Sequence, residues 1–155
     1  MRILPRRAHT GGAPPSPQIP MLDRAGLYRG RQALIVDEKA LNAEVLGTLL
    51  ASFGVAARIL FSPQGLEEAI YNAERLDVLS LDLELPERDG FLVHRQIRTL
   101  PQIQDLRVGA YTVQTSQIAK ARRERSDDFL AKPLLQERFG EQLGRILRRE
   151  PVWDV

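Results

Sequence analysis

The centre of this sequence is Val78-Leu79-Ser80-Leu81-Asp82-Leu83-Glu84-Leu85-Pro86-Glu87-Arg88-Asp89-Gly90. It begins with an apolar run that has the length of a buried strand. Asp82 ends the run, and a loop with Pro86 and a closing Asp89-Gly90 follows. Residues that carry chemistry gather at the carboxyl ends of the strands in parallel α/β sheets. The pattern therefore predicts a reactive carboxylate at Asp82, although the same acid could cap a tight loop.

Strand and helix patterns alternate on both sides of this stretch. The other predicted strands are Ala33-Leu34-Ile35-Val36, Val55 to Phe61, Arg107 to Thr112 and Asp128-Phe129-Leu130-Ala131. Helical spacing is seen in Leu41, Val45, Leu49 and Phe53, with Leu46 and Leu50 beside them, up to Gly54. It is also seen after Ser62-Pro63, from Phe91 to Leu100, over 116–125, and from Leu135 to Leu147. The alternation predicts one flavodoxin-like, doubly wound (βα)5 domain, with a five-stranded parallel sheet in the order 2-1-3-4-5.

The chain divides into three parts by composition. Residues 1–31 contain Pro, Gly and Arg without a period and predict a flexible leader, although the apolar positions in 21–31 could dock onto the domain or form a short helix. Residues 32–149 form the predicted domain and residues 150–155 a tail. The positive charge lies in the leader, and a short arginine-containing arm is more often solvated than bound to a partner. The sequence has no cysteine and no long apolar run, so we expect a cytoplasmic protein with no membrane segment.

The predicted strand order brings distant polar residues to one edge of the sheet. Strands 1 and 3 are neighbours in this order, so Asp37 and Glu38 are expected beside Asp82. Thr112 ends the fourth strand, and Lys132 follows the fifth, at the same edge. The three carboxylates supply the hard oxygen ligands that Mg²⁺ prefers, so they predict a Mg²⁺ site. Asp37 and Glu38 could also cap the helix that follows them.

Four motifs in this order resemble the receiver domain of two-component response regulators. They are Leu34-Ile35-Val36-Asp37-Glu38; Asp82 with Pro86 and Asp89-Gly90; Ala110-Tyr111-Thr112; and Asp127-Asp128-Phe129-Leu130-Ala131-Lys132-Pro133. The resemblance covers about residues 32–149. It implies that Asp82 accepts a phosphoryl group from a histidine kinase or a histidine phosphotransferase. It also implies that Asp37, Glu38, Asp82 and the backbone carbonyl of Glu84 hold Mg²⁺.

The resemblance also implies roles for residues near the fifth strand. Lys132 would pair with a phosphoryl oxygen or with Asp82, and a cis peptide before Pro133 would direct it inward. Thr112 and Phe129 would form a switch that changes the surface of the helix over 116–125, the fifth strand and the last helix. Each has an ordinary alternative: Thr112 as a plain strand residue, Lys132 as a surface lysine and Phe129 as a core residue.

The expected output is protein contact, because few residues follow the last helix. We expect a single-domain regulator, a phosphorelay shuttle or a receiver cut from a sensor kinase, with an unknown downstream protein as partner and a homodimer as a possible assembly. Nucleic-acid binding and enzymatic turnover are not expected. Two alternatives are an aspartyl-nucleophile Mg²⁺ phosphohydrolase and a receiver-like module that is never phosphorylated. His94 is expected on a solvent-facing helix surface, and Lys120, Arg122, Arg123 and Arg125 on a solvated face or a docking patch.

Overall fold

A parallel sheet forms the middle of the computed structural model, which describes residues 26–85, 89–103, 106–112, 115–132 and 134–154. The strand order is β2-β1-β3-β4-β5-β6, and all neighbouring strands are parallel. The strands are β1 (Gln32–Val36), β2 (Ala56–Leu60), β3 (Val78–Leu81), β4 (Arg107–Thr112), β5 (Asp128–Ala131) and β6 (Trp153–Asp154). The predicted order of the first five strands is confirmed, and β6 was not predicted.

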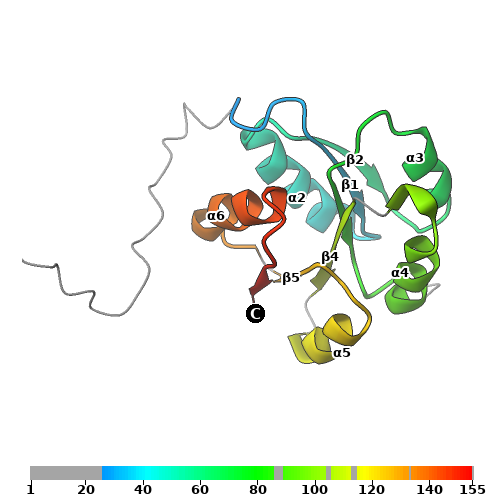
Figure 1. The fold of residues 1–155 in the computed structure, drawn as a ribbon. Coiled ribbons are helices and arrows are strands. Elements are labelled where there is room, and N and C mark those ends of the chain that lie inside the picture. Colours follow the sequence, from blue (N-terminus) through cyan, green and yellow to red (C-terminus); the bar gives the residue numbers. More distant parts are fainter. Residues whose placement is uncertain (1–25, 86–88, 104–105, 113–114, 133, 155) are drawn as a thin grey trace, which may run out of the picture.

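Helices cover both faces of the sheet. They are α2 (Ala40–Ser52), α3 (Leu66–Asn72), α4 (Gly90–Arg98), α5 (Ile118–Arg123) and α6 (Gln136–Leu147), with 3-10 turns η1 (Pro101–Ile103) and η2 (Thr115–Gln117). Figure 1 shows α2 and α6 together on one face, and α3, α4 and α5 on the other. In the described part of the chain, every helix is too short or too polar to cross a membrane.

The alternation of side chains along β1 explains the two-sided core. Ala33 and Ile35 pack in the cluster beneath α2 and α6, while Leu34 and Val36 pack in the cluster with residues of α3 and α4. Successive side chains of a strand point to opposite faces, and all four are almost fully buried. A third, smaller cluster consists of Leu83, Phe91, Ala110, Ala121 and Phe129, with Ile118 and Trp153 packed against it.

The inner face of α2 agrees with the predicted stripe at Leu46, Leu50 and Phe53 but differs from it at two other positions. Leu41 and Val45 are exposed, whereas Ala43, Leu46 and Leu50 are buried. Both sets have helical spacing, so the sequence pattern could not separate them. The end of the helix is as predicted, because Gly54 has a φ of 86°.

The start of α3 is also later than predicted. Ser62-Pro63 was expected to begin the helix, but α3 begins at Leu66 behind Gly65, which has a φ of 80°. The amide of Leu66 donates to the carbonyl of Pro63, so a turn precedes the helix. Leu66 and Ile70, which have helical spacing in the sequence, are buried.

The expectation that His94 faces solvent was wrong. His94 lies on α4 and is 2% exposed, and neither ring nitrogen has a hydrogen-bond partner among the described residues. Burial, and next the charge of Arg98, lower the pKa of His94 to about 4. The ring is therefore a neutral buried group.

Both ends of the predicted domain extend further than the sequence indicated. The amide of Tyr28 donates to the carbonyl of Phe53 at 2.9 Å, and the two rings are in contact. At the other end, the expected tail includes Val152, which is fully buried, and β6, which pairs with β5. The docking of Tyr28 was one of the arrangements that the sequence left open, whereas the short C-terminal segment gave no periodicity from which its packing could be predicted.

Candidate functional site

Asp82 stands directly after the central strand β3. Its amide donates to the carbonyl of Val36 at 3.0 Å, which continues the pairing of β3 with β1 beyond Leu81. The residue is 2% exposed, and its Oδ1 accepts a hydrogen bond from the amide of Glu84 at 3.0 Å. Burial raises the pKa of the Asp82 carboxyl, and nearby Asp37 raises it further. The Glu84 amide and the Lys132 ammonium act in the opposite direction.

A lysine joins two aspartates that are far apart in the sequence. Lys132 Nζ lies 2.7 Å from Asp37 Oδ2 and 3.3 Å from Asp82 Oδ2, and all three side chains are almost completely buried. The amide of Lys132 donates to the carbonyl of Thr112 at 2.9 Å, which holds the lysine at the end of β4. Strands β1, β3, β4 and β5 thus bring these groups together at one edge of the sheet, as predicted.

The loop after Asp82 is held close to the start of α4. Glu84 and Asp89 form an antiparallel bridge, and Asp89 Oδ1 accepts a hydrogen bond from the amide of Phe91. Gly90 lies so near the loop that a Cβ there would stand 2.5 Å from Leu83 Cα and 2.8 Å from the Asp82 carbonyl oxygen. The Asp-Gly pair therefore caps α4 and allows a backbone contact that a side chain would prevent.

Thr112 and Phe129 share one face of the sheet. Ala110 pairs with Phe129 and Thr112 with Ala131, so all four side chains project to the same side. Ala110 and Phe129 belong to the third cluster, next to Leu83. Thr112 and Phe129 are both fully buried.

Tyr111 is a site residue that sequence reasoning did not single out. Lys132 Nζ lies 4.6 Å from the centre of its ring, a distance typical of a cation–π contact. Burial first, and then the charges of Asp37 and Asp82, raise the pKa of Tyr111 to about 12. The only available signal was an aromatic residue directly before Thr112, on the strand face opposite to it.

The residues of this site supply part of the oxygen ligands that a hard divalent cation needs. Two buried carboxylates, Asp37 and Asp82, offer oxygen donors around a single lysine, and Glu38 is half-buried beside Asp37. Over the described ranges, no three acidic, histidine or cysteine side chains are gathered closely enough to form a metal site on their own. Asp37 and Asp82 are thus the residues of the predicted ligand set that Lys132 joins, and their binding of Mg²⁺ stays a prediction. Pro133 lies outside the described residues.

This fold and this site define a class of protein, namely doubly wound α/β domains with buried aspartates and a lysine at the carboxyl edge of the sheet. Residues 33–143 match the family model of the response regulator receiver domain, which covers more than half of the chain. The chain belongs to this family, whose members serve as phosphoacceptor domains in two-component signalling. Receiver domains generally bind Mg²⁺ at their acidic pocket.

Individual relatives agree with this assignment. The uncharacterized transcriptional regulatory protein YvcP of Bacillus subtilis (strain 168) is 31% identical over 117 residues, which are 75% of this chain and 48% of that protein. Probable histidine kinase 4 of Oryza sativa subsp. japonica is 29% identical over 75 residues, which are 48% of this chain and 8% of that protein. The chain therefore spans a small part of that kinase and about half of YvcP.

Among solved structures, a putative response regulator from Chloroflexus aurantiacus J-10-fl has 28% identity and a TM-score of 0.69. The match covers 76% of this chain and 98% of that one. It supports the family assignment over nearly the whole length of that structure.

Proposed function

We propose that Asp82 is the phosphoacceptor of this receiver domain and that a histidine kinase or a histidine phosphotransferase is the donor. The contact of Lys132 Nζ with both Asp37 and Asp82 is the observation that carries the proposal. A carboxylate nucleophile needs no general base, but it must be held in place beside positive charge. The geometry around Asp82 meets both needs.

The reaction exchanges one bond to phosphorus for another. An oxygen of Asp82 bonds to phosphorus while the phosphorus–nitrogen bond of the phosphohistidine breaks, and the imidazole keeps the electron pair. Lys132 then turns from Asp82 to an oxygen of the phosphoryl group, because its ammonium is a compact charge with three donors. The Glu84 amide keeps Asp82 Oδ1 in a constant orientation during the transfer.

The proposed Mg²⁺ ligands are Asp37, Glu38, Asp82 and the backbone carbonyl of Glu84. When bound, the ion neutralises charge that accumulates between the phosphoryl oxygens and the carboxylates. Asp37 is the residue of this set that is best supported, since it is fully buried and shares Lys132 with Asp82. Its Oδ1 also accepts from the Lys39 amide at 2.9 Å, which limits its rotation.

Thr112 and Phe129 are proposed to carry the signal away from Asp82. The hydroxyl of Thr112 would donate to a phosphoryl oxygen, and the ring of Phe129 would follow into the space that opens. Their common face of the sheet supports this coupling. The surface that changes is formed by α5, β5 and α6. Of these, α5 has a single buried residue, Ala121, and can shift at little cost.

The wider biology follows from the same proposal. The domain would work in the cytoplasm, where it is phosphorylated and dephosphorylated but performs no turnover on another substrate. Its output would be a phosphorelay step or contact with a downstream protein, with a homodimer as one such assembly and without nucleic-acid binding.

Phosphorylation with a small donor tests the proposal. The wild-type chain is incubated with acetyl phosphate and Mg²⁺, and intact mass is compared with Asp82→Asn and with Asp77→Asn. The control has the same change in charge at an aspartate bound to Arg31 and Arg75. We expect one stable phosphoryl group on the wild type and the control, and none on Asp82→Asn.

Other results would favour the alternatives. Equal labelling of Asp82→Asn removes Asp82 from the role. Continuous release of phosphate from a phosphomonoester favours a phosphohydrolase. A chain that Mg²⁺ and beryllofluoride leave spectroscopically unchanged favours an unphosphorylated interaction module.

A further inference from the structure

The last described residues of the chain cover the outer edge of β5. In β6, Trp153 pairs with Phe129 and Asp154 pairs with Leu130. The amide of Phe129 donates to the carbonyl of Val152 at 2.7 Å, and Val152 is fully buried. Without this segment, β5 would present unpaired backbone groups to any extended chain that approached it. Residues 150–154, the C-terminal segment, therefore close an edge that would otherwise be available for pairing.

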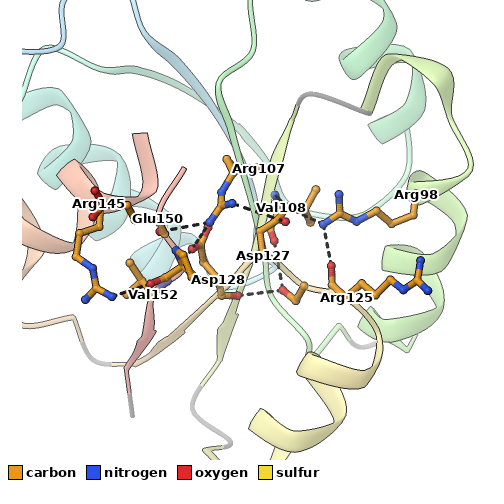
Figure 2. A network of polar contacts seen from close by, with 11 residues as sticks. Arg98, Arg107, Val108, Arg125, Asp127, Asp128, Arg145, Glu150 and Val152 are labelled. Carbon is orange, nitrogen blue, oxygen red and sulfur yellow. Dashed lines mark hydrogen bonds and ion pairs between the residues drawn. The ribbon is translucent and has the colours of Figure 1, made fainter. Parts of the chain in front are cut away.

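Side chains of the domain hold the C-terminal segment by its backbone. Figure 2 shows the contacts. Asp128 Oδ1 accepts from the amide of Val152 at 3.0 Å and from Arg107 Nη2 at 2.8 Å. Arg145 Nη2 donates to the carbonyl of Pro151 at 2.7 Å. Arg107 Nη2 also lies 3.4 Å from the carbonyl of Glu150. These contacts come from β4, β5 and α6, so the segment is bound at a specific position.

Trp153 connects the C-terminal segment to the third cluster. Its ring stacks on that of Phe129, with centroids 6.4 Å apart and an interplanar angle of 11°. The guanidinium of Arg122, on α5, lies 4.7 Å from the centre of the Trp153 ring. The indole therefore contacts both α5 and β5, and β5 carries the proposed switch residue Phe129.

The third cluster reaches from Trp153 back to the candidate site. Leu83 follows Asp82 directly, and Ala110 and Phe129 pair across β4 and β5. Only Ala121 of α5 is buried above them. A movement of the Phe129 ring would remove the surface on which Trp153 stacks. The hydrogen bonds from Asp128, Arg107 and Arg145 reach residues 150–152, so Trp153 and Asp154 would then be held by the two-residue pairing of β6 and the contact with Arg122.

We propose that the C-terminal segment is a latch, which closes the edge of β5 in the unphosphorylated domain and opens when Asp82 is phosphorylated. This inference rests on the proposed function, since it needs phosphorylation at Asp82 and movement of Phe129. Opening frees the backbone edge of β5 and the α5 surface beside Arg122. The chain thus controls access to its own proposed signalling surface.

Trp153 is the only tryptophan of the chain, so its fluorescence reports on the latch. The full chain is treated with Mg²⁺ and acetyl phosphate, and quenching of the emission by iodide is measured together with intact mass. We expect phosphorylation to increase the quenching constant severalfold and to shift the emission to longer wavelength. Asp82→Asn, treated in the same way, should show neither change.

Hydrogen exchange provides a second, independent measurement. The amide of Phe129 is bonded to the carbonyl of Val152 in the closed state, so phosphorylation should accelerate its exchange. Phe129→Leu keeps an apolar side chain but removes the stacking partner. In this variant, we expect Trp153 to be quenched readily before phosphorylation, with little further increase afterwards.

The outcomes separate the latch from the phosphoacceptor role. Phosphorylated wild type with unchanged quenching and unchanged exchange at Phe129 overturns the latch and leaves the proposed function intact. Absence of phosphorylation at Asp82 overturns both. A fluorescence change of the same size in Asp82→Asn overturns the latch, because it would come from the donor itself.

Discussion

Replacing Gly90 with alanine should displace the loop that holds Asp82. The new Cβ would stand 2.5 Å from Leu83 Cα, whereas ordinary contact begins at 3.4 Å, so the two segments must separate by about 0.9 Å. The atoms that it meets belong to the backbone and cannot rotate away. The Asp82 carbonyl oxygen, at 2.8 Å, is one of them. The displacement therefore acts directly on the residue proposed to accept the phosphoryl group.

The expected cost follows from the size of this overlap. Inserting a group into a closely packed site costs about 1–3 kcal/mol. A gain in helix propensity of at most about 1 kcal/mol offsets part of it, because Gly90 is the first residue of α4. We expect the unfolding free energy to fall by about 1–2 kcal/mol. Phosphorylation should slow as well, because displacement of Asp82 disturbs the contact between its Oδ2 and Lys132 Nζ, which are 3.3 Å apart.

Urea unfolding and the rate of labelling by acetyl phosphate measure both effects. Gly47→Ala is the matched control, because its Cβ would lie 3.8 Å from Ile59 Cδ1 and 3.9 Å from Ile35 Cδ1, in ordinary contact. Gly47 is inside α2, so this variant should gain about 0.5–1 kcal/mol and be labelled at the wild-type rate. Wild-type stability and labelling of Gly90→Ala would refute the argument from close approach.

Three further predictions concern charge. Lys132→Met leaves two buried carboxylates without their cation and should lower the unfolding free energy at pH 7 by about 3–5 kcal/mol. The loss should shrink as the pH falls and Asp82, whose pKa burial raises, takes up a proton; urea unfolding at pH 7 and pH 5 checks this, and an equal loss at both would contradict it. Asp82→Asn should raise the unfolding free energy at pH 7 by about 0.5–2 kcal/mol, because burial raises the pKa of Asp82 and so disfavours its ionised form in the folded state. The same urea assay near pH 3 should show the gain lost, and a gain that persists there would argue against the cause. The pKa of His94 is lowered from 6.5 to about 4, so the unfolded chain binds more protons between these values, and stability falls as the pH decreases through this window. The charged groups that act on the His94 ring are Arg98, Glu124 and Asp127. At pH 4.5, His94→Leu should remove a cost of about 2–3 kcal/mol, and an unchanged pH dependence of its unfolding would show that His94 does not titrate in this way.

Much of the site could be predicted because it lies at strand ends. An apolar strand followed by an acid is visible in the local sequence at Asp37 and at Asp82, and the alternation of strands and helices then orders the sheet. Lys132 could be predicted in the same way, from its position after the fifth strand. The ion pairs at 2.7 and 3.3 Å confirm that these three residues meet.

Other features could not be predicted, because two faces of an element had similar patterns. Leu41 and Val45 had the same helical spacing as the residues that α2 buries, and His94 was expected on the solvent-facing side of its helix although it is buried in the folded domain. Which face is buried depends on the elements packed against it, and periodicity does not contain that information.

By itself, the sequence determined the order of the first five strands and the residues at their carboxyl ends, since strand and helix periods are local properties of the chain. Only the tertiary structure decided that Trp153 lies against Phe129, that the C-terminal segment closes the edge of β5, and that Tyr111 lies beside Lys132. These contacts join segments through side-chain packing and a two-residue strand, which leave no period in the sequence. They exist because the folded sheet brings the segments within reach of one another.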